Sequence, residues 1–99
     1  IHLNYLNDTK YYGPQVFYNG KNIYLANIIQ KELNNNLNTS RKVKLIPKET
    51  YMYSKLKIPG VLIECGFLSN EEERNKLIST SYQQKFAKIV ANGIVKYFS

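Results

Sequence analysis

The chain has 99 residues, of which 43% are hydrophobic, so it has the length of one small domain and the composition of a globular protein. No stretch approaches the roughly 20 consecutive apolar residues that a membrane-spanning helix needs. Fourteen basic residues against seven acidic residues give a net charge of +7, which favours polyanionic partners such as nucleic acid, anionic lipid or an anionic cell-wall polymer.

The start of the chain and its cysteine content restrict the class of protein further. The opening, IHLNYLNDTK, lacks the basic start and apolar run of a secretory leader. It begins without a Met and partway through an expected strand, so we expect a fragment or a processed product, with a trimmed disordered leader as the alternative. The single cysteine, Cys65, excludes an intrachain disulfide framework and a Cys-rich zinc finger.

Strand and helix patterns follow one another in the first half of the chain. The segment GPQVFYN (13–19) predicts a strand, because a turn-forming Gly-Pro precedes residues of high strand propensity. From Asn22 the apolar residues recur at helical spacing, which predicts an amphipathic helix that ends in the Asn-rich segment. Residues 38–50 are polar and basic, and we expect an exposed loop there. The apolar positions of the helix are Leu25, Ile28, Ile29, Leu33 and Leu37.

The second half contains the most apolar segment, GVLIECGF (60–67). Its unbroken run GVLIE is typical of a strand covered on both faces, and we expect this strand to end at Glu64. Gly66 would then permit a close approach or turn the chain away. The segment SNEEER predicts a helix capped by Ser69 or Asn70. A last helix carries one apolar face over four turns, formed by Tyr82, Phe86, Ile89, Val90, Ile94 and Tyr97.

This order of elements predicts an α/β fold with a central, mostly parallel sheet flanked by helices. In such sheets function gathers at the carboxyl ends of the strands, where Glu64 is expected. One interpretation of Glu64 is a general base, because partial desolvation brings carboxylates in general closer to proton exchange at working pH. The alternative is a structural carboxylate that pairs with a basic side chain or accepts helix-start amides.

His2, the only histidine, lies at the expected end of another strand, and it is either a functional or a structural residue. One histidine and one glutamate do not complete a catalytic zinc site, which normally takes three protein ligands. Cys65 with His2 can be imagined as a thiol nucleophile and its base. However, Cys65 and Glu64 are neighbours in a strand, so their side chains should point to opposite faces.

The basic residues give only weak support for a binding function. The cluster formed by Arg41, Lys42, Lys44 and Lys48 is more typical of a solvated loop than of a binding site. A nucleic-acid role would rest on the net charge and nine tyrosines, without a recognised binding motif.

Five segments in chain order carry a family resemblance: IHLN, GPQVFY, LANIIQKEL, PGVLIECGFLSNEEERNKL and YQQKFAKIVANGIVKYF. Together they resemble the zinc-dependent N-acetylmuramoyl-L-alanine amidases of the amidase-3 family, whose usual pattern includes Ser-Ile-His-x-Asn and Glu-x-Gly-Phe-x-Ser-Asn. The resemblance covers nearly the whole chain, and its Pro-Gly in place of Pro-Ala is closest to the germination-specific amidases of spore formers. It implies that residues 1–99 are the C-terminal part of a single amidase catalytic domain.

The resemblance implies hydrolysis of the amide between N-acetylmuramic acid and L-alanine of peptidoglycan, by a zinc-activated water with Glu64 as general base and acid. His2 matches the last of the family's three zinc ligands, and the other two belong to the preceding half of the family's domain. Asn4 matches the Asn of the His-x-Asn pattern, and Arg41 matches a loop arginine. Both are candidate substrate-binding residues, although Lys42 replaces the glycine that follows this arginine in the family.

The missing ligands imply that residues 1–99 alone have negligible activity and weak zinc affinity. The implied partners are peptidoglycan, the N-terminal half of the domain and, in the spore-wall members, a protein activator, but no nucleic acid. The implied location is outside the cell or in its wall, including the spore cortex and the forespore intermembrane space. The alternatives are a non-catalytic cell-wall or partner-binding module on the same fold, and a different zinc or thiol hydrolase on a similar scaffold.

Overall fold

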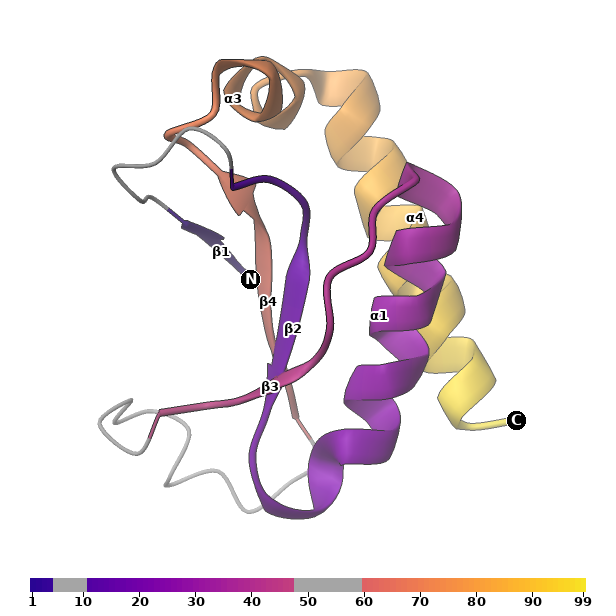
Figure 1. The fold of residues 1–99 in the computed structure, drawn as a ribbon. Coiled ribbons are helices and arrows are strands. Elements are labelled where there is room, and N and C mark those ends of the chain that lie inside the picture. The colour runs from indigo at the N-terminus through magenta and orange to yellow at the C-terminus, as the bar shows by residue number, and fades with distance from the viewer. Residues whose placement is uncertain (5–10, 48–59) are drawn as a thin grey trace.

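The computed structural model describes residues 1–4, 11–47 and 60–99, and it contains a four-stranded sheet (Figure 1). The strands lie in the order β1-β4-β2-β3. Strand β1 pairs parallel with β4, β2 pairs antiparallel with β4, and β3 pairs parallel with β2. Two of the three pairings are parallel, which confirms the predicted mostly parallel α/β sheet. The strands are β1 (His2–Asn4), β2 (Gln15–Tyr18), β3 (Lys44–Leu45) and β4 (Leu62–Phe67).

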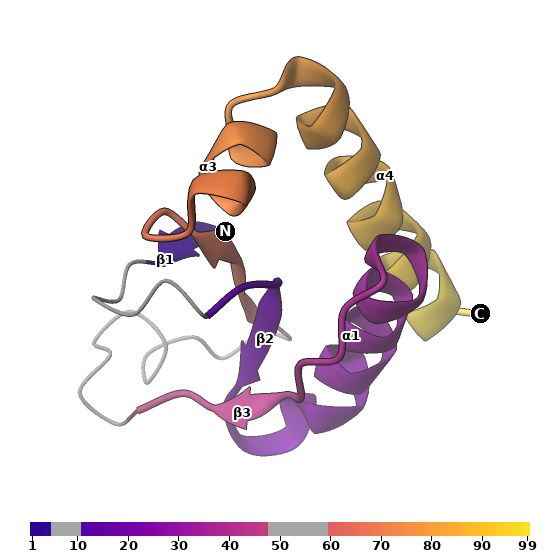
Figure 2. The ribbon, with the colours of Figure 1, turned by 45° about the horizontal axis from the view of Figure 1, so that its top comes forward.

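Helices α1 (Ile23–Leu37) and α4 (Thr80–Tyr97) lie side by side against one face of the sheet, as Figures 1 and 2 show. A short 3-10 turn, η1 (Gly20–Asn22), leads into α1, and α3 (Glu71–Leu77) joins β4 to α4. No helix within the described ranges is both long enough and apolar enough to cross a bilayer.

The core lies between the sheet and the helix pair. Side chains alternate along a strand, so Val16 of β2 and Ile63 and Cys65 of β4 face the helices, while Gln15 and Glu64 leave from the opposite face. The helices contribute the predicted apolar stripes, and burial of this surface stabilises the fold. Their buried core residues are Leu25, Ala26, Ile29, Leu33, Phe86, Ile89 and Val90.

The predicted apolar face of α4 is wrong at one position. Ile94 is 42% exposed, whereas its neighbour Gly93 is buried against α1. A Cβ at Gly93 would lie 3.1 Å from Cγ1 and 3.3 Å from Cα of Ile29. The two helices therefore make a close approach at Gly93, and Ile94 lies on the outer side of the contact.

The expected exposed loop at 38–50 is confirmed at residues 38–43 and is wrong at residues 44–46. Lys44 and Leu45 form β3, Ile46 is buried, and its N–H donates to the carbonyl of Tyr18 at 2.8 Å. Without β3, the outer edge of β2 would expose unpaired backbone N–H and C=O groups. The basic segment therefore forms a strand because its backbone pairs with these groups. Residues 48–50 lie outside the described ranges.

Candidate functional site

Strands β1 and β4 bring the two predicted functional side chains together. His2 and Glu64 are register partners in this parallel pair, and their side chains leave the sheet on the same face. His2 is exposed and Glu64 is half-buried. The expectation that Glu64 ends its strand is wrong, because β4 continues to Phe67, which is the partner of Asn4 in β1.

The pairing of β1 with β4 is irregular between His2 and Asn4, where the register shifts. Irregularities of this kind are common next to active sites, because they change the direction of a side chain. The backbone of Asn4 is therefore placed beside the end of β4, three residues beyond Glu64 in register. Its position is compatible with the substrate-binding role that the resemblance implies.

Cys65 lies on the face opposite Glu64, as the alternation of the strand predicts. Its side chain is 7% exposed and belongs to the core. Burial raises the pKa of the Cys65 thiol to about 11. The nucleophilic form of a cysteine is the thiolate, so this residue is poorly suited to thiol catalysis.

Arg41 is held on the Glu64 face of the sheet by three groups. Its Nη2 donates to Oε1 of Gln15 at 3.0 Å, and its Nη1 donates to the carbonyl of Tyr12 at 3.5 Å. Its guanidinium carbon lies 5.0 Å from the centre of the Phe67 ring, a cation–π arrangement. The predicted solvated loop residue is therefore partly buried and held against the strand that carries Glu64.

Gln15 is a site residue that sequence reasoning missed. It is the antiparallel partner of Glu64, it binds Arg41, and its Nε2 donates to the carbonyl of Lys42 at 2.8 Å. Alternation with Val16 places its side chain on the Glu64 face. That signal could have been used only with knowledge of the β2–β4 register.

Two polar atoms at this face are buried without a hydrogen-bond partner among the described residues. They are Oε2 of Glu64 and Nε of Arg41. An unsatisfied buried polar group costs about 1–3 kcal/mol, so native proteins rarely keep one without a role or a further partner. A water, a substrate group or another part of the protein would satisfy these atoms.

The residues on this face fit one side of a zinc site. His2 offers an exposed imidazole, and its register partner Glu64 has a carboxylate oxygen without a hydrogen-bond partner among the described residues. Within residues 1–4, 11–47 and 60–99, no group of three His, Cys, Asp or Glu side chains could hold a metal ion. A catalytic zinc normally takes three protein ligands, so His2 would need ligands from beyond these residues.

Glu73 is a buried carboxylate that the sequence analysis also missed. It lies in the first turn of α3, where Asn70 caps the helix as predicted by accepting the N–H of Glu73 at 3.0 Å. The Oε1 of Glu73 accepts hydrogen bonds from the N–H groups of Gly13 at 2.5 Å and Phe67 at 3.2 Å. Glu73 is only 6% exposed.

Gly66 makes the burial of Glu73 possible. A Cβ at this position would lie 2.8 Å from Oε1 of Glu73, which is closer than real Cβ contacts. The glycine lies within β4, so it does not turn the chain away from the site. Of the two roles predicted for Gly66, the structure supports the close approach.

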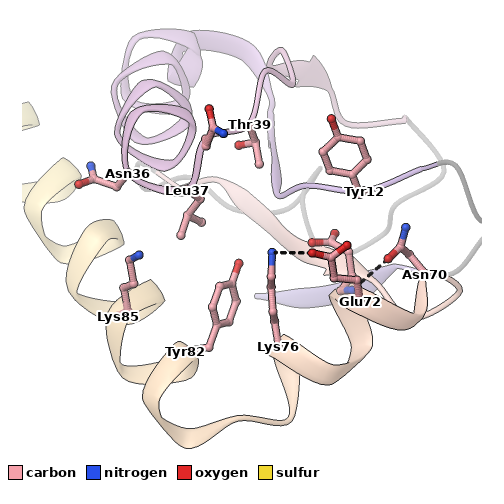
Figure 3. Close-up of a pocket in the computed structure, with 11 residues that line it drawn as sticks. Tyr12, Asn36, Leu37, Thr39, Asn70, Glu72, Lys76, Tyr82 and Lys85 are labelled. Carbon is pink, nitrogen blue, oxygen red and sulfur yellow. Dashed lines mark hydrogen bonds and ion pairs between the residues drawn. The ribbon is translucent and has the colours of Figure 1, made fainter.

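A cavity of about 570 Å³ lies between the end of α1, α3 and the start of α4 (Figure 3). Lys76, Tyr82 and Lys85 line one side and Leu37 the other, with Glu73 also in the lining. Burial, with the charge of Glu73 as a smaller cause, raises the pKa of Tyr82 to about 12. His2 and Glu64 are not among the described lining residues, so this cavity is separate from the candidate site.

Comparison with known proteins gives the family. Residues 1–96 match the model of the amidase-3 family, N-acetylmuramoyl-L-alanine amidase. The chain belongs to this family. The match confirms the resemblance carried by the IHLN and ECGFLSN segments.

Amidase-3 relatives share both sequence and fold with this chain. The germination-specific N-acetylmuramoyl-L-alanine amidase of Bacillus subtilis (strain 168) is 45% identical over 103 residues, which cover 100% of this chain and 43% of the relative. The CwlD amidase from Clostridioides difficile, solved in complex with the GerS lipoprotein, is 40% identical with a TM-score of 0.90. That match covers 97% of this chain and 51% of CwlD.

More distant amidases keep the same fold. The amidase AmiC2 of Nostoc punctiforme matches with a TM-score of 0.87 at 26% identity, over 97% of this chain and 54% of that one. The chain thus spans about half the length of the relatives that it matches. The α/β fold expected from the sequence is the fold of these amidases.

Proposed function

We propose that residues 1–99 form the C-terminal part of a peptidoglycan amidase domain that hydrolyses the amide between N-acetylmuramic acid and L-alanine. The observation that carries this proposal is the pairing of His2 with Glu64 on adjacent strands of an amidase-3 chain. An imidazole beside a carboxylate, one oxygen of which is buried without a partner in the part of the chain that the structure describes, suits a hydrolytic site that binds zinc.

Glu64 is the proposed general base and acid. Its carboxylate takes a proton from the attacking water and then delivers that proton to the nitrogen of the departing L-alanine. β4 pairs with strands on both sides, so it holds this carboxylate rigidly at the reacting bond. His2, together with ligands from the rest of the protein, would hold a zinc ion, which would supply Lewis-acid polarisation of the scissile carbonyl.

Arg41 and Asn4 are the proposed substrate-binding residues. The guanidinium of Arg41 is oriented by Gln15 and Phe67, and its Nε is left without a partner among the described residues. A planar guanidinium binds carboxylate and carbonyl oxygens in a fixed direction, which suits recognition of the stem peptide. Asn4 follows His2 on the same strand and provides the second polar contact.

The proposed setting is the bacterial cell wall, including the spore cortex. The net charge of +7 favours binding to an anionic wall polymer. Because the matching CwlD amidase was solved in complex with a lipoprotein, we also propose that a protein partner binds this amidase. Secretion to the wall or to the space around the forespore follows from this substrate.

Product analysis tests the proposed reaction. The full-length protein is incubated with purified cortex and with vegetative peptidoglycan, and free amino groups and muropeptide masses are then measured. The expected product is a stem peptide with a free L-alanine amino group, lost on chelation and restored by zinc. New reducing sugar ends or a different free amine would reject the amidase reaction. Tight binding to peptidoglycan without any product would favour the non-catalytic wall-binding module.

A further inference from the structure

Glu73 is a buried carboxylate for which the proposed reaction has no use. Its Oε1 binds two backbone N–H groups that lie far apart in the sequence. One belongs to Gly13, which precedes β2, and the other belongs to Phe67, the last residue of β4. Glu73 therefore ties the end of the Glu64 strand to the segment that leads into the neighbouring strand.

The two segments that Glu73 joins also carry the three groups that hold Arg41. Phe67 supplies the ring under the guanidinium, and Tyr12, next to Gly13, supplies a carbonyl acceptor. The third group, Gln15, lies two residues beyond Gly13 in the same segment. A shift of either segment would therefore displace the support of Arg41.

Fold stability alone is a weak explanation for this arrangement. Burying a carboxylate is costly, and apolar residues of similar volume often stabilise a fold as well or better. Here the burial also requires a glycine at position 66, because a Cβ there would lie 2.8 Å from Oε1 of Glu73. What the carboxylate provides is geometry, since one oxygen fixes two backbone groups by charge-assisted hydrogen bonds.

We propose that Glu73 is a positioning residue of the amidase site. By fixing Phe67 and the Tyr12–Gly13 segment, it orients the guanidinium of Arg41 on the Glu64 face of the sheet. The catalytic part of this proposal rests on the proposed function, whereas the effect of Glu73 on Arg41 does not.

A double-mutant cycle in the full-length enzyme tests the coupling. The value of kcat/KM is measured for the wild type, Glu73→Ala, Arg41→Ala and the double variant. A misplacement of about 1 Å at such a site can cost about 100-fold, so each single variant is expected to lose on the order of 100-fold. The double variant should be no worse than the poorer single variant, and both single variants should share the same split between kcat and KM.

Two matched variants sharpen the cycle. Glu73→Gln keeps an acceptor oxygen and should restore most of kcat/KM, whereas Glu71→Ala removes an exposed carboxylate from the same helix turn and should change little. Zinc content should stay at the wild-type value in all of them. Multiplicative losses in the double variant, or wild-type kcat/KM in a Glu73→Ala protein that has only lost stability, would overturn the proposal.

A second variant and an activity-independent signal cover the case in which Glu73→Ala fails to fold. Gly66→Ala keeps the Glu73 side chain but pushes its carboxylate out of position, so it should reproduce the loss of kcat/KM. The NMR signals of the Arg41 Nε–H and of the Gly13 and Phe67 amides should shift in Gly66→Ala relative to Glu71→Ala, whereas the Arg41 signal should stay close to its wild-type position in Glu73→Gln. An unmoved Arg41 signal in Gly66→Ala would overturn the positioning role. A wild-type enzyme that releases no L-alanine amine would reject the proposed function but leave this signal interpretable.

Discussion

His2 and Glu64 are direct register partners on the parallel strands β1 and β4, although most of the chain lies between them. The imidazole and the carboxylate are therefore neighbours through strand pairing and not through a local motif. This pairing gives each residue a separate, measurable role in the proposed amidase.

Glu64→Gln should remove turnover without removing zinc. The amide keeps the size of the side chain but cannot accept the proton of the attacking water, so kcat should fall on the order of 10²- to 10⁴-fold. The measurement is release of L-alanine amine together with a zinc count by elemental mass spectrometry. Glu71→Gln, on an exposed position of α3, is the matched control. Turnover that survives in Glu64→Gln would remove Glu64 from the mechanism.

His2→Ala should lower zinc affinity on the order of 10-fold or more, because it removes one ligand of the proposed site. Zinc content after dialysis against a graded series of chelator concentrations measures the change. Glu64→Gln serves as the comparison, since the same site loses a charge there but no ligand. Undiminished zinc loading of His2→Ala would clear this residue of the metal-binding role.

The buried thiol of Cys65 should make the folded protein less stable in alkaline solution. Burial raises the pKa of the folded thiol from 9.0 to about 11, so between these values the unfolded chain has lost a proton that the folded chain keeps. The free energy of unfolding therefore decreases as the pH rises from about 9 to about 11, and the loss is complete above the folded pKa. Urea titrations of the wild type and Cys65→Ala across this range measure it.

The same thiol should react with iodoacetamide at pH 8 only after unfolding, because it is protonated and buried in the core. Cys65→Ala should show a flatter stability profile above pH 9 and retain amidase activity. Loss of all turnover in a folded Cys65→Ala protein would instead support the thiol hydrolase alternative.

Gly93→Ala should destabilise the contact between α1 and α4. The added Cβ meets Cγ1 of Ile29 at 3.1 Å and the Cα of Ile29, which is backbone, at 3.3 Å. Overpacking of this kind costs about 1–3 kcal/mol, while the helix propensity of alanine returns about 1 kcal/mol. Thermal unfolding should show a lower Tm for Gly93→Ala and an equal or higher Tm for Asn92→Ala, an exposed position on the same helix. An unchanged Tm in Gly93→Ala would mean that the helices separate there without cost.

Local patterns in the sequence predict the parts of the fold that local physics decides. Helical spacing identifies Leu25, Ile29 and Leu33 as the core face of α1. The predicted capping position before the three glutamates is occupied by Asn70, which caps α3. The alternation of a strand separates Glu64 from Cys65. These predictions are confirmed because each depends on neighbours within about one turn or one strand.

The errors arise where distant segments meet. Gln30 is buried on α1 because its Oε1 accepts the N–H of Val16 at 2.7 Å and its Nε2 donates to the carbonyl of Pro14 at 3.1 Å. The hydrophobic periodicity of the sequence does not predict that a glutamine will join a helix to a strand. The burial of Glu73 depends in the same way on segments that the sequence does not place next to it.

The candidate site was predicted to a similar extent. Residue type and the family resemblance predict His2 and Glu64 as its two principal residues, and the structure makes them register partners on adjacent strands. The support around Arg41 could not be predicted, since it depends on the register between β2 and β4 and on the path of the segment after α1.

The strand order β1-β4-β2-β3 determines when such a site can exist. Of the four described strands β4 is synthesised last, yet it lies between β1 and β2, which have no described partner in common until it arrives. Contacts between such distant segments form slowly, because the chain between them must first be ordered. A growing chain would therefore carry His2 without Glu64 beside it, and the two side chains would come together only in the step that inserts β4 between β1 and β2.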